Sequence, residues 1–230
     1  MIAAAFVRLG KSLGSTALLL TLISGCSVFT STVPPPAYYS LDHTRREASP
    51  ARAVRTGGLA AATQSEPVQG RTNSKGGPTL IVHPPSAASG YDSPRILYVR
   101  EDHQLEYFAH SEWVDTPAHM LEPLMVAAIR KGATFHAVVP TPSTAAGDLR
   151  LNTEVIRLHQ VFTSGASYVR FTLRAYLVDN VTRRVLAWRE FDQSVAAESA
   201  DTYGGVVAAN RVVQSVLEQL AGFCSETARH

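Results

Sequence analysis

Hydrophobic and polar residues alternate along the second half of the chain, and this period of two predicts long β-strands. Residues 168–178 read YVRFTLRAYLV, in which apolar side chains take the odd positions and arginine, threonine and tyrosine take even ones. The segments 148–162 and 184–196 alternate in the same way, with a break near Val155-Ile156 that predicts a β-bulge. Turn residues separate the three segments, so three long antiparallel strands are expected.

Two other segments repeat apolar residues every three or four positions, which predicts amphipathic helices. In the first, Asp115 or Thr116 supplies a cap, and Gly132 ends the pattern. Pro123 falls near the second turn, so this helix is expected to start late or to bend. The second helix is expected to open at Asp201 or Thr202. Its apolar face consists of Val206, Val213, Leu217 and Leu220, with Asn210 among them.

Shorter apolar runs predict further strands in 37–42 (AYYSLD), 79–85 (TLIVHPP) and 135–140 (FHAVVP). The segment RILYVREDHQLEYF predicts a hairpin around Glu101-Asp102-His103. Strands that lie between two helices indicate an α+β fold. The expected architecture is an antiparallel sheet with three long C-terminal strands and two main helices packed on one face.

The N-terminus carries an apolar run at about 13–23, preceded by Arg8 and Lys11. The run is too short to cross a bilayer, which needs about 20 residues, and fits the core of a secretory signal. It ends in Ile23-Ser24-Gly25-Cys26, which resembles a bacterial lipobox. We therefore expect a signal peptide at 1–25 and acyl chains, palmitate among them, on Cys26. The alternative is an ordinary signal peptide with a chance cysteine.

Composition divides the rest of the chain. Residues 26–36 are expected to form a lipidated, Pro-rich tether, and 37–78 a possible first strand followed by a disordered insertion at 43–78. Residues 79–222 form the expected α+β domain, and 223–230 a tail.

Charge excludes a basic nucleic-acid surface. The chain has 21 Lys and Arg against 19 Asp and Glu, and loss of Arg8 and Lys11 with the signal leaves the two signs balanced. Of the two cysteines, Cys224 ends an apolar helical pattern and is expected to be a small buried hydrophobe. The oligomeric state stays open at this point.

Candidate chemistry is sparse. The sequence contains no GxSxG, SxxK or HExxH motif, and none of the eight histidines pairs at helical spacing. We therefore expect no enzyme, no cofactor and no metal site. Arginines follow the long strands at Arg170, Arg174, Arg183, Arg184 and Arg189. They either bind lipid phosphates or acidic groups of a partner, or form a solvated sheet face.

The stretch from Tyr91 to Leu121 carries a resemblance to a known family. Ser93-Pro94-Arg95-Ile96-Leu97-Tyr98-Val99-Arg100, the aromatic Leu105-Glu106-Tyr107-Phe108 and then Trp113 precede the first helix. With the lipobox and YYSLD, this order resembles the ABC-type transport auxiliary lipoproteins, the PqiC-like family. The resemblance covers 26–42 and 79–222, and the insertion at 43–78 departs from it.

The resemblance implies a non-catalytic envelope lipoprotein. Such proteins accompany an ABC permease and ATPase complex and an MCE-domain protein, in systems that move lipids between inner and outer membranes. The residues carried over as structural or interface candidates are Trp113, Tyr98, Tyr107 and Phe108, beside Arg170 and Arg174 of the long strands. The alternative function is a structural or assembly lipoprotein bound to an outer-membrane barrel or to cell-wall machinery.

The residue after Cys26 bears on location. In enteric bacteria an aspartate at this place retains lipoproteins on the inner membrane, whereas this chain has Ser27. The expected location is the periplasmic side of the envelope, lipid-anchored in the outer membrane.

Overall fold

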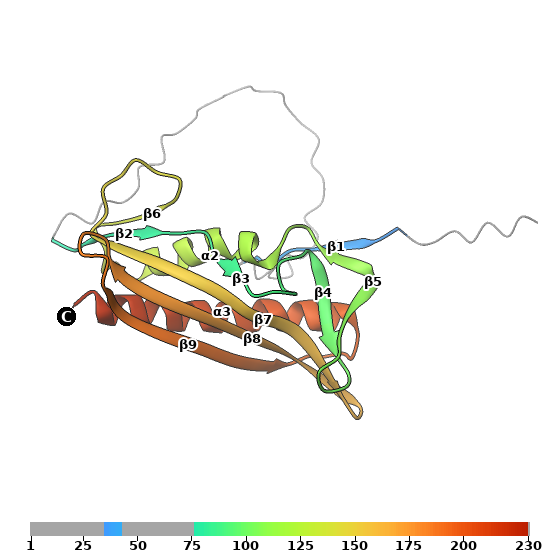
Figure 1. Cartoon of the computed structure of the whole chain (residues 1–230). Helices are drawn as coiled ribbons and strands as arrows, with labels where there is room; N and C mark the ends of the chain where they lie inside the picture. Colours follow the sequence, from blue (N-terminus) through green and yellow to red (C-terminus); the bar gives the residue numbers. More distant parts are fainter. Residues whose placement is uncertain (1–34, 43–75, 230) are drawn as a thin grey trace, which may run out of the picture. The chain divides into compact units, whose positions relative to one another are not determined.

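The computed structural model describes residues 35–42 and 76–229, and all elements below belong to one compact unit, Pro36–His230. Within these residues the chain forms a mixed nine-stranded sheet and two helices (Figure 1). The expected signal peptide at 1–25, Cys26, most of the tether and residues 43–75 of the expected insertion lie outside the described residues.

Three long antiparallel strands dominate the sheet, as the alternation predicts. They are β7 (Leu149–Thr163), β8 (Ala166–Asp179) and β9 (Val185–Ala196). The β7–β8 pairing runs the full length of both strands, and its register shifts between Val155 and Arg157, where the bulge was expected. Gly165 forms the turn between β7 and β8 with φ +84°, a conformation that glycine adopts without strain.

The remaining strands make the sheet mixed, so the expectation of a purely antiparallel sheet is wrong. The short strands are β1 (Ala37–Tyr39), β2 (Thr79–Val82), β3 (Ser86–Ala87), β4 (Arg95–Val99), β5 (Leu105–Trp113) and β6 (Ala137–Pro140). Strands β2, β3 and β4 each pair parallel with β7, β6 pairs parallel with β2, and β1 pairs parallel with β5. Only β4 and β5 form the expected antiparallel hairpin among them. Parallel neighbours need a crossover, and the connection from β2 to its parallel neighbour β6 includes the β4–β5 hairpin and α2.

Both helices begin at side-chain caps. Thr116 accepts the backbone N–H of His119 and opens α2 (Pro117–Lys131), which runs through Pro123 without a late start. Asp201 accepts the N–H of Gly204 at 2.7 Å and opens α3 (Thr202–Thr227). Helix α3 continues past residue 222, where a tail was expected, because Phe223 and Cys224 are buried in the core.

The core lies between the helices and one face of the sheet. Helix α3 runs along β8 and β9 and also packs against α2 (Figure 1). The largest fully buried side chains come from both helices and from the inward positions of the sheet: Phe171, Leu80, Leu121, Met125, Ile129, Leu151, Leu173, Leu177, Leu217 and Leu220. The odd positions of β8 supply Phe171, Leu173 and Leu177, as the sequence pattern predicts.

Asn210 fastens the first described segment to α3. Its side-chain oxygen accepts the N–H of Asp42 at 2.8 Å, and its amide nitrogen donates to the carbonyl of Ser40 at 3.2 Å. Leu41 between them is 5% exposed. The polar residue within the apolar face of α3 therefore holds the N-terminal segment beside the sheet.

Trp113 and Trp188 give a matched test of the core. Trp113 is 4% exposed and belongs to the core, whereas Trp188 is 63% exposed. We expect Trp113→Ala to lower the free energy of unfolding by about 3–5 kcal/mol, because it leaves a cavity. Trp188→Ala should cost less than about 1.5 kcal/mol, the value of one lost aromatic pair. Urea unfolding measures both, and equal losses would contradict this packing.

Candidate interaction surface

The sheet face opposite the helices carries most of the polar side chains of the long strands. We call this surface the outer face, and it consists of Asn152, Glu154, Arg170, Thr172, Arg174, Tyr176, Trp188, Glu190 and Asp192. Cross-strand register sets the order: Tyr176 lies opposite Trp188, Arg174 opposite Glu190 and Thr172 opposite Asp192. The face is therefore aromatic at the β8–β9 turn and charged along its middle.

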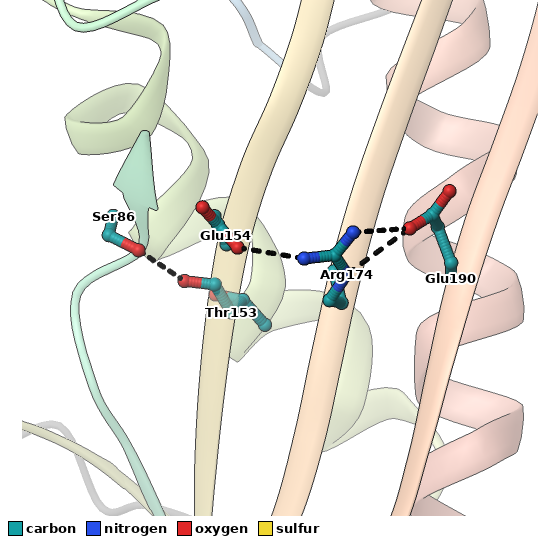
Figure 2. A network of polar contacts seen from close by, with 5 residues as sticks. All are labelled: Ser86, Thr153, Glu154, Arg174 and Glu190. Carbon is teal, nitrogen blue, oxygen red and sulfur yellow. Dashed lines mark hydrogen bonds and ion pairs between the residues drawn. The ribbon is translucent and has the colours of Figure 1, made fainter. Parts of the chain in front are cut away.

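Arg174 bridges three strands of the outer face. Its Nη1 lies 3.4 Å from a carboxylate oxygen of Glu154 on β7, while its Nε and Nη2 donate to Glu190 on β9 at 3.1 and 2.9 Å (Figure 2). Figure 2 also shows Ser86 of β3, whose hydroxyl donates to the carbonyl of Thr153 at 3.3 Å. The guanidinium thus has an acidic partner on either side of β8.

Arg170, four residues before Arg174 on β8, is also paired with an acid of β9. It donates through Nε and Nη2 to both oxygens of Asp192, and the Thr172 hydroxyl donates to the same carboxylate at 2.9 Å. These hydrogen bonds lower the pKa of Asp192 to about 2. Arg170 and Arg174 are therefore both paired with acids of this chain. This pairing disfavours the alternative in which they bind lipid phosphates or acidic groups of a partner.

His159 of β7 lies beside Arg170 of the outer face and is paired with Tyr91 from the connection between β3 and β4. The Tyr91 hydroxyl is hydrogen-bonded to Nδ1 of His159 at 2.9 Å, with the two rings stacked. Burial, and then the positive charges of Arg157 and Arg170, lower the pKa of His159 to about 4. The imidazole is consequently neutral at physiological pH.

The aromatic candidates of the β4–β5 hairpin divide into a buried and an exposed group. Tyr98 and Phe108 pack together at 4.6 Å between ring centroids, and both contact Phe162 of β7. Tyr98 also donates its hydroxyl to Glu106 at 2.9 Å. Tyr107 points outward, half exposed beneath the guanidinium of Arg95. Tyr98 and Phe108 therefore join the hairpin to the sheet, while Tyr107 faces solvent.

Sequence reasoning missed the exposed tryptophan. Trp188 stacks on Tyr176 with 6.4 Å between ring centroids and remains 63% exposed. The available signal was its position: it shares the even-numbered face of β9 with Glu190 and Asp192, which are polar. A large aromatic ring on a polar strand face favours a contact surface.

The described residues hold few groups suited to reaction chemistry. No cluster of three or more His, Cys, Asp or Glu residues suited to a metal occurs within 35–42 and 76–229. Burial raises the pKa of the Cys224 thiol to about 12, so it carries no thiolate at neutral pH. In the same described part, neither helix is long and apolar enough to cross a bilayer.

Comparison with known proteins follows the fold. The model of a family described as the ABC-type transport auxiliary lipoprotein component matches residues 59–221. A solved protein from Xanthomonas campestris, assigned to the family DUF330, is 26% identical, covers 66% of this chain and 86% of its own, and superposes with a TM-score of 0.62. A crystal structure of an uncharacterized protein is 14% identical, covers 83% and 99%, and has a TM-score of 0.57, so it supports the fold alone. No curated protein matches the sequence significantly.

The buried His159 predicts a pH dependence of stability. Its folded pKa of about 4 lies below the ordinary 6.5, so the unfolded chain takes up the proton first as the pH falls. Its contribution is fully present above pH 6.5 and is lost progressively toward pH 4. Between pH 7 and 5 we expect about 1 kcal/mol of loss, discounted for partial exposure, or about 2–4 °C in Tm.

The control is His159→Gln, which does not titrate and can still bond the Tyr91 hydroxyl. Calorimetry of both proteins at pH 7 and pH 5 measures the difference. A wild-type loss no larger than that of the variant would show that folding does not lower the pKa of His159.

Proposed function

The chain belongs to the family of ABC-type transport auxiliary lipoprotein components, and from this membership we propose that it is a non-catalytic accessory of a lipid-moving ABC system. Membership itself implies the cell envelope and an association with an ABC transport system. In the proposed role the chain docks an ABC permease and ATPase complex, through an MCE-domain protein, to its membrane. The cargo is lipid that moves between the inner and outer membranes.

One observation carries the proposal: the family match spans the domain that holds the outer face. That face is an organised surface of paired charges and an exposed aromatic end, and the helices leave it uncovered. Surfaces of this kind favour protein contacts, in which exposed aromatic rings supply much of the affinity. The paired charges set register and orientation in such a contact.

Anchoring at Cys26 is the second part of the proposal. Lipoprotein-family membership and the Ile23-Ser24-Gly25-Cys26 sequence support it. Residues 27–36, if extended at about 3.1 Å each, reach about 30 Å, which sets the domain close to its own membrane. Ser27 in place of an aspartate supports the outer membrane as that membrane.

Replacing Cys26 tests the anchor. We expect Cys26→Ala to abolish incorporation of labelled palmitate and to shift the chain from the membrane to the soluble fraction, because the thiol that carries the acyl chains is gone. Cys224→Ala is the matched control and should keep both label and membrane fractionation, since Cys224 is buried. Separation of the two membranes by density then locates the wild-type chain. A Cys26→Ala chain that stays with washed membranes would place the anchor elsewhere.

The transport role is tested on the wild-type chain purified from its native membranes in mild detergent. A permease, an ATPase and an MCE-domain protein should co-purify in fixed proportion, and deletion of the chain should slow the exchange of labelled phospholipid between the two membranes. Co-purification with only a barrel or cell-wall proteins, with unchanged lipid exchange, would favour the structural alternative.

A further inference from the structure

Exposed apolar side chains gather at the turn between β8 and β9. Val181 is 83% exposed, Val185 55%, Leu186 49% and Trp188 63%, all within eight residues of sequence. We call these four residues, with Tyr176 and the arginines Arg183 and Arg184, the turn patch. The other exposed large hydrophobic residues of the described chain are Tyr38, Leu105, Tyr107, Val114 and Tyr203. Contiguous exposed apolar groups of this kind mark contact sites.

The strand register explains why these side chains have no cover. Within the described residues β9 pairs only with β8, so it is an edge strand. The ladder pairs Leu177 with Ala187 and Val178 with Val185, which leaves Leu186 as the extra residue of a bulge. Trp188 lies opposite Tyr176 on the face without helices. Nothing in the fold of the described chain buries this corner.

The turn carries two arginines, Arg183 and Arg184, and one acid, Asp179. Asp179 accepts the backbone N–H groups of Val181 and Thr182 at 2.9 and 2.7 Å, which ties its carboxylate to the backbone of the turn. Arg183 and Arg184 are exposed, and neither forms an ion pair with the part of the chain that the structure describes. Arg183 holds φ at +62°, a conformation that is unfavourable for arginine by about 1 kcal/mol relative to glycine.

Neighbouring charges add to the positive character of the corner. Arg150 of β7 lies opposite Val178 of β8. Its Nε is buried without a hydrogen-bond partner in the described chain. Glu190, an acid of the outer face, is paired with Arg174. The corner therefore combines three guanidinium groups, of which Arg184 lies near the carboxylate of Asp179, with aromatic and aliphatic surface.

The N-terminal segment enters at the other end of the sheet. Strand β1 pairs with Ser111–Trp113 of β5, where Glu112 lies opposite Arg95 of β4, three residues before the Tyr98 that pairs with Gln160 of β7. The turn patch adjoins Arg150, about seven residues from that level along β7, or roughly 23 Å at 3.3 Å per residue. Figure 1 shows β1 and the β8–β9 turn at opposite ends of the sheet. This separation is shorter than the reach of the tether, about 30 Å.

We propose that the turn patch lies on the anionic lipid surface of the bilayer that holds the anchor. This proposal rests on the Cys26 anchor of the proposed function. Guanidinium groups attract anionic headgroups, while tryptophan and aliphatic side chains enter the interfacial layer. An acyl anchor and a basic patch are two signals that together give stable attachment. Contacts at both ends hold the long strands along the membrane rather than upright on it.

The two tryptophans provide the readout. The full-length chain is reconstituted into vesicles of phosphatidylcholine alone or with phosphatidylglycerol, each containing lipid brominated in the acyl chains. Trp113 is buried in the core. The Trp188→Phe variant retains only Trp113, so its emission is the background to subtract. We expect bromolipid to quench Trp188 in the anionic vesicles and to leave it largely unquenched in the neutral ones. Added salt should reverse the quenching, because surface charges are screened.

A charge variant tests the arginines. Arg183→Asn combined with Arg184→Ser keeps a residue that tolerates positive φ and removes both charges. Each lost arginine should lower the ratio of docked to undocked protein about fivefold, or roughly 25-fold for both. The control pair, Lys131→Ser with Arg211→Ser, removes the same charge from the helices and should leave quenching unchanged.

The outcomes separate the two proposals. A chain that leaves the vesicles during flotation would overturn the anchor, and the two-ended attachment with it. A chain that stays bound, yet shows equal Trp188 emission in neutral and anionic vesicles, would overturn the turn patch alone. Quenching that persists in the double arginine variant, or protection of Trp188 by a co-purified protein in place of lipid, would also overturn it.

Discussion

The antiparallel pairing of β7 with β8 is the constraint on which the rest of the structure depends. It is the longest ladder in the described chain and runs from Leu149 opposite Asp179 to Thr163 opposite Ala166. Strands β2, β3 and β4 pair with the other edge of β7, and β9 pairs with the free edge of β8. Helix α3 packs on the same two long strands. Loss of this ladder would separate β8, β9 and the part of α3 packed on them from β7 and the short strands that pair with it.

The two faces of the ladder have different tasks. The inner face buries Phe171, Leu173 and Leu177 against the helices, and this apolar burial supplies most of the stabilisation. The outer face has no helix, so its polar groups must pair with one another or with water. Arg174 and Arg170 meet this requirement by bridging to Glu190 and Asp192 across the strands. The exposed side chains at the β8–β9 turn have no such cross-strand ion pairs within the described chain. The proposed function uses the outer face for protein contacts, and the further proposal uses its turn end for contact with lipid.

Much of the fold could be predicted from the sequence because alternation reports which side of a strand is buried. Alternation predicted the long strands and the bulge near Val155. Apolar residues at every third or fourth position, together with cap residues, predicted the two helices. Alternation did not give strand direction, because side chains alternate identically in parallel and antiparallel sheets. A signal did exist in TLIV: Leu80, Ile81 and Val82 are all buried, and a continuous apolar run is typical of parallel strands covered on both faces.

The interaction surface was only half predictable for a related reason. Arg170 and Arg174 were visible as candidates, but their pairing with Asp192 and Glu190 depends on the register between two strands. Trp113 and Trp188 are alike in sequence context, since each follows a strand pattern. Their burial differs because one ends a strand against the core and the other lies on an edge strand with no cover. Whether a strand lies at an edge depends on the assembled sheet, so it cannot be predicted from the residues of that strand alone.

Native-state hydrogen exchange of the full-length chain tests the central role of the β7–β8 ladder most directly. Amides that bond across this ladder should exchange slowest, with opening free energies equal to that of global unfolding, because they open only when the whole domain does. Amides of β1 and of the free edge of β9 should exchange through smaller, local openings. Ladder amides near Leu151 and Leu177 that exchange faster than those of β2 or β4 would contradict the account.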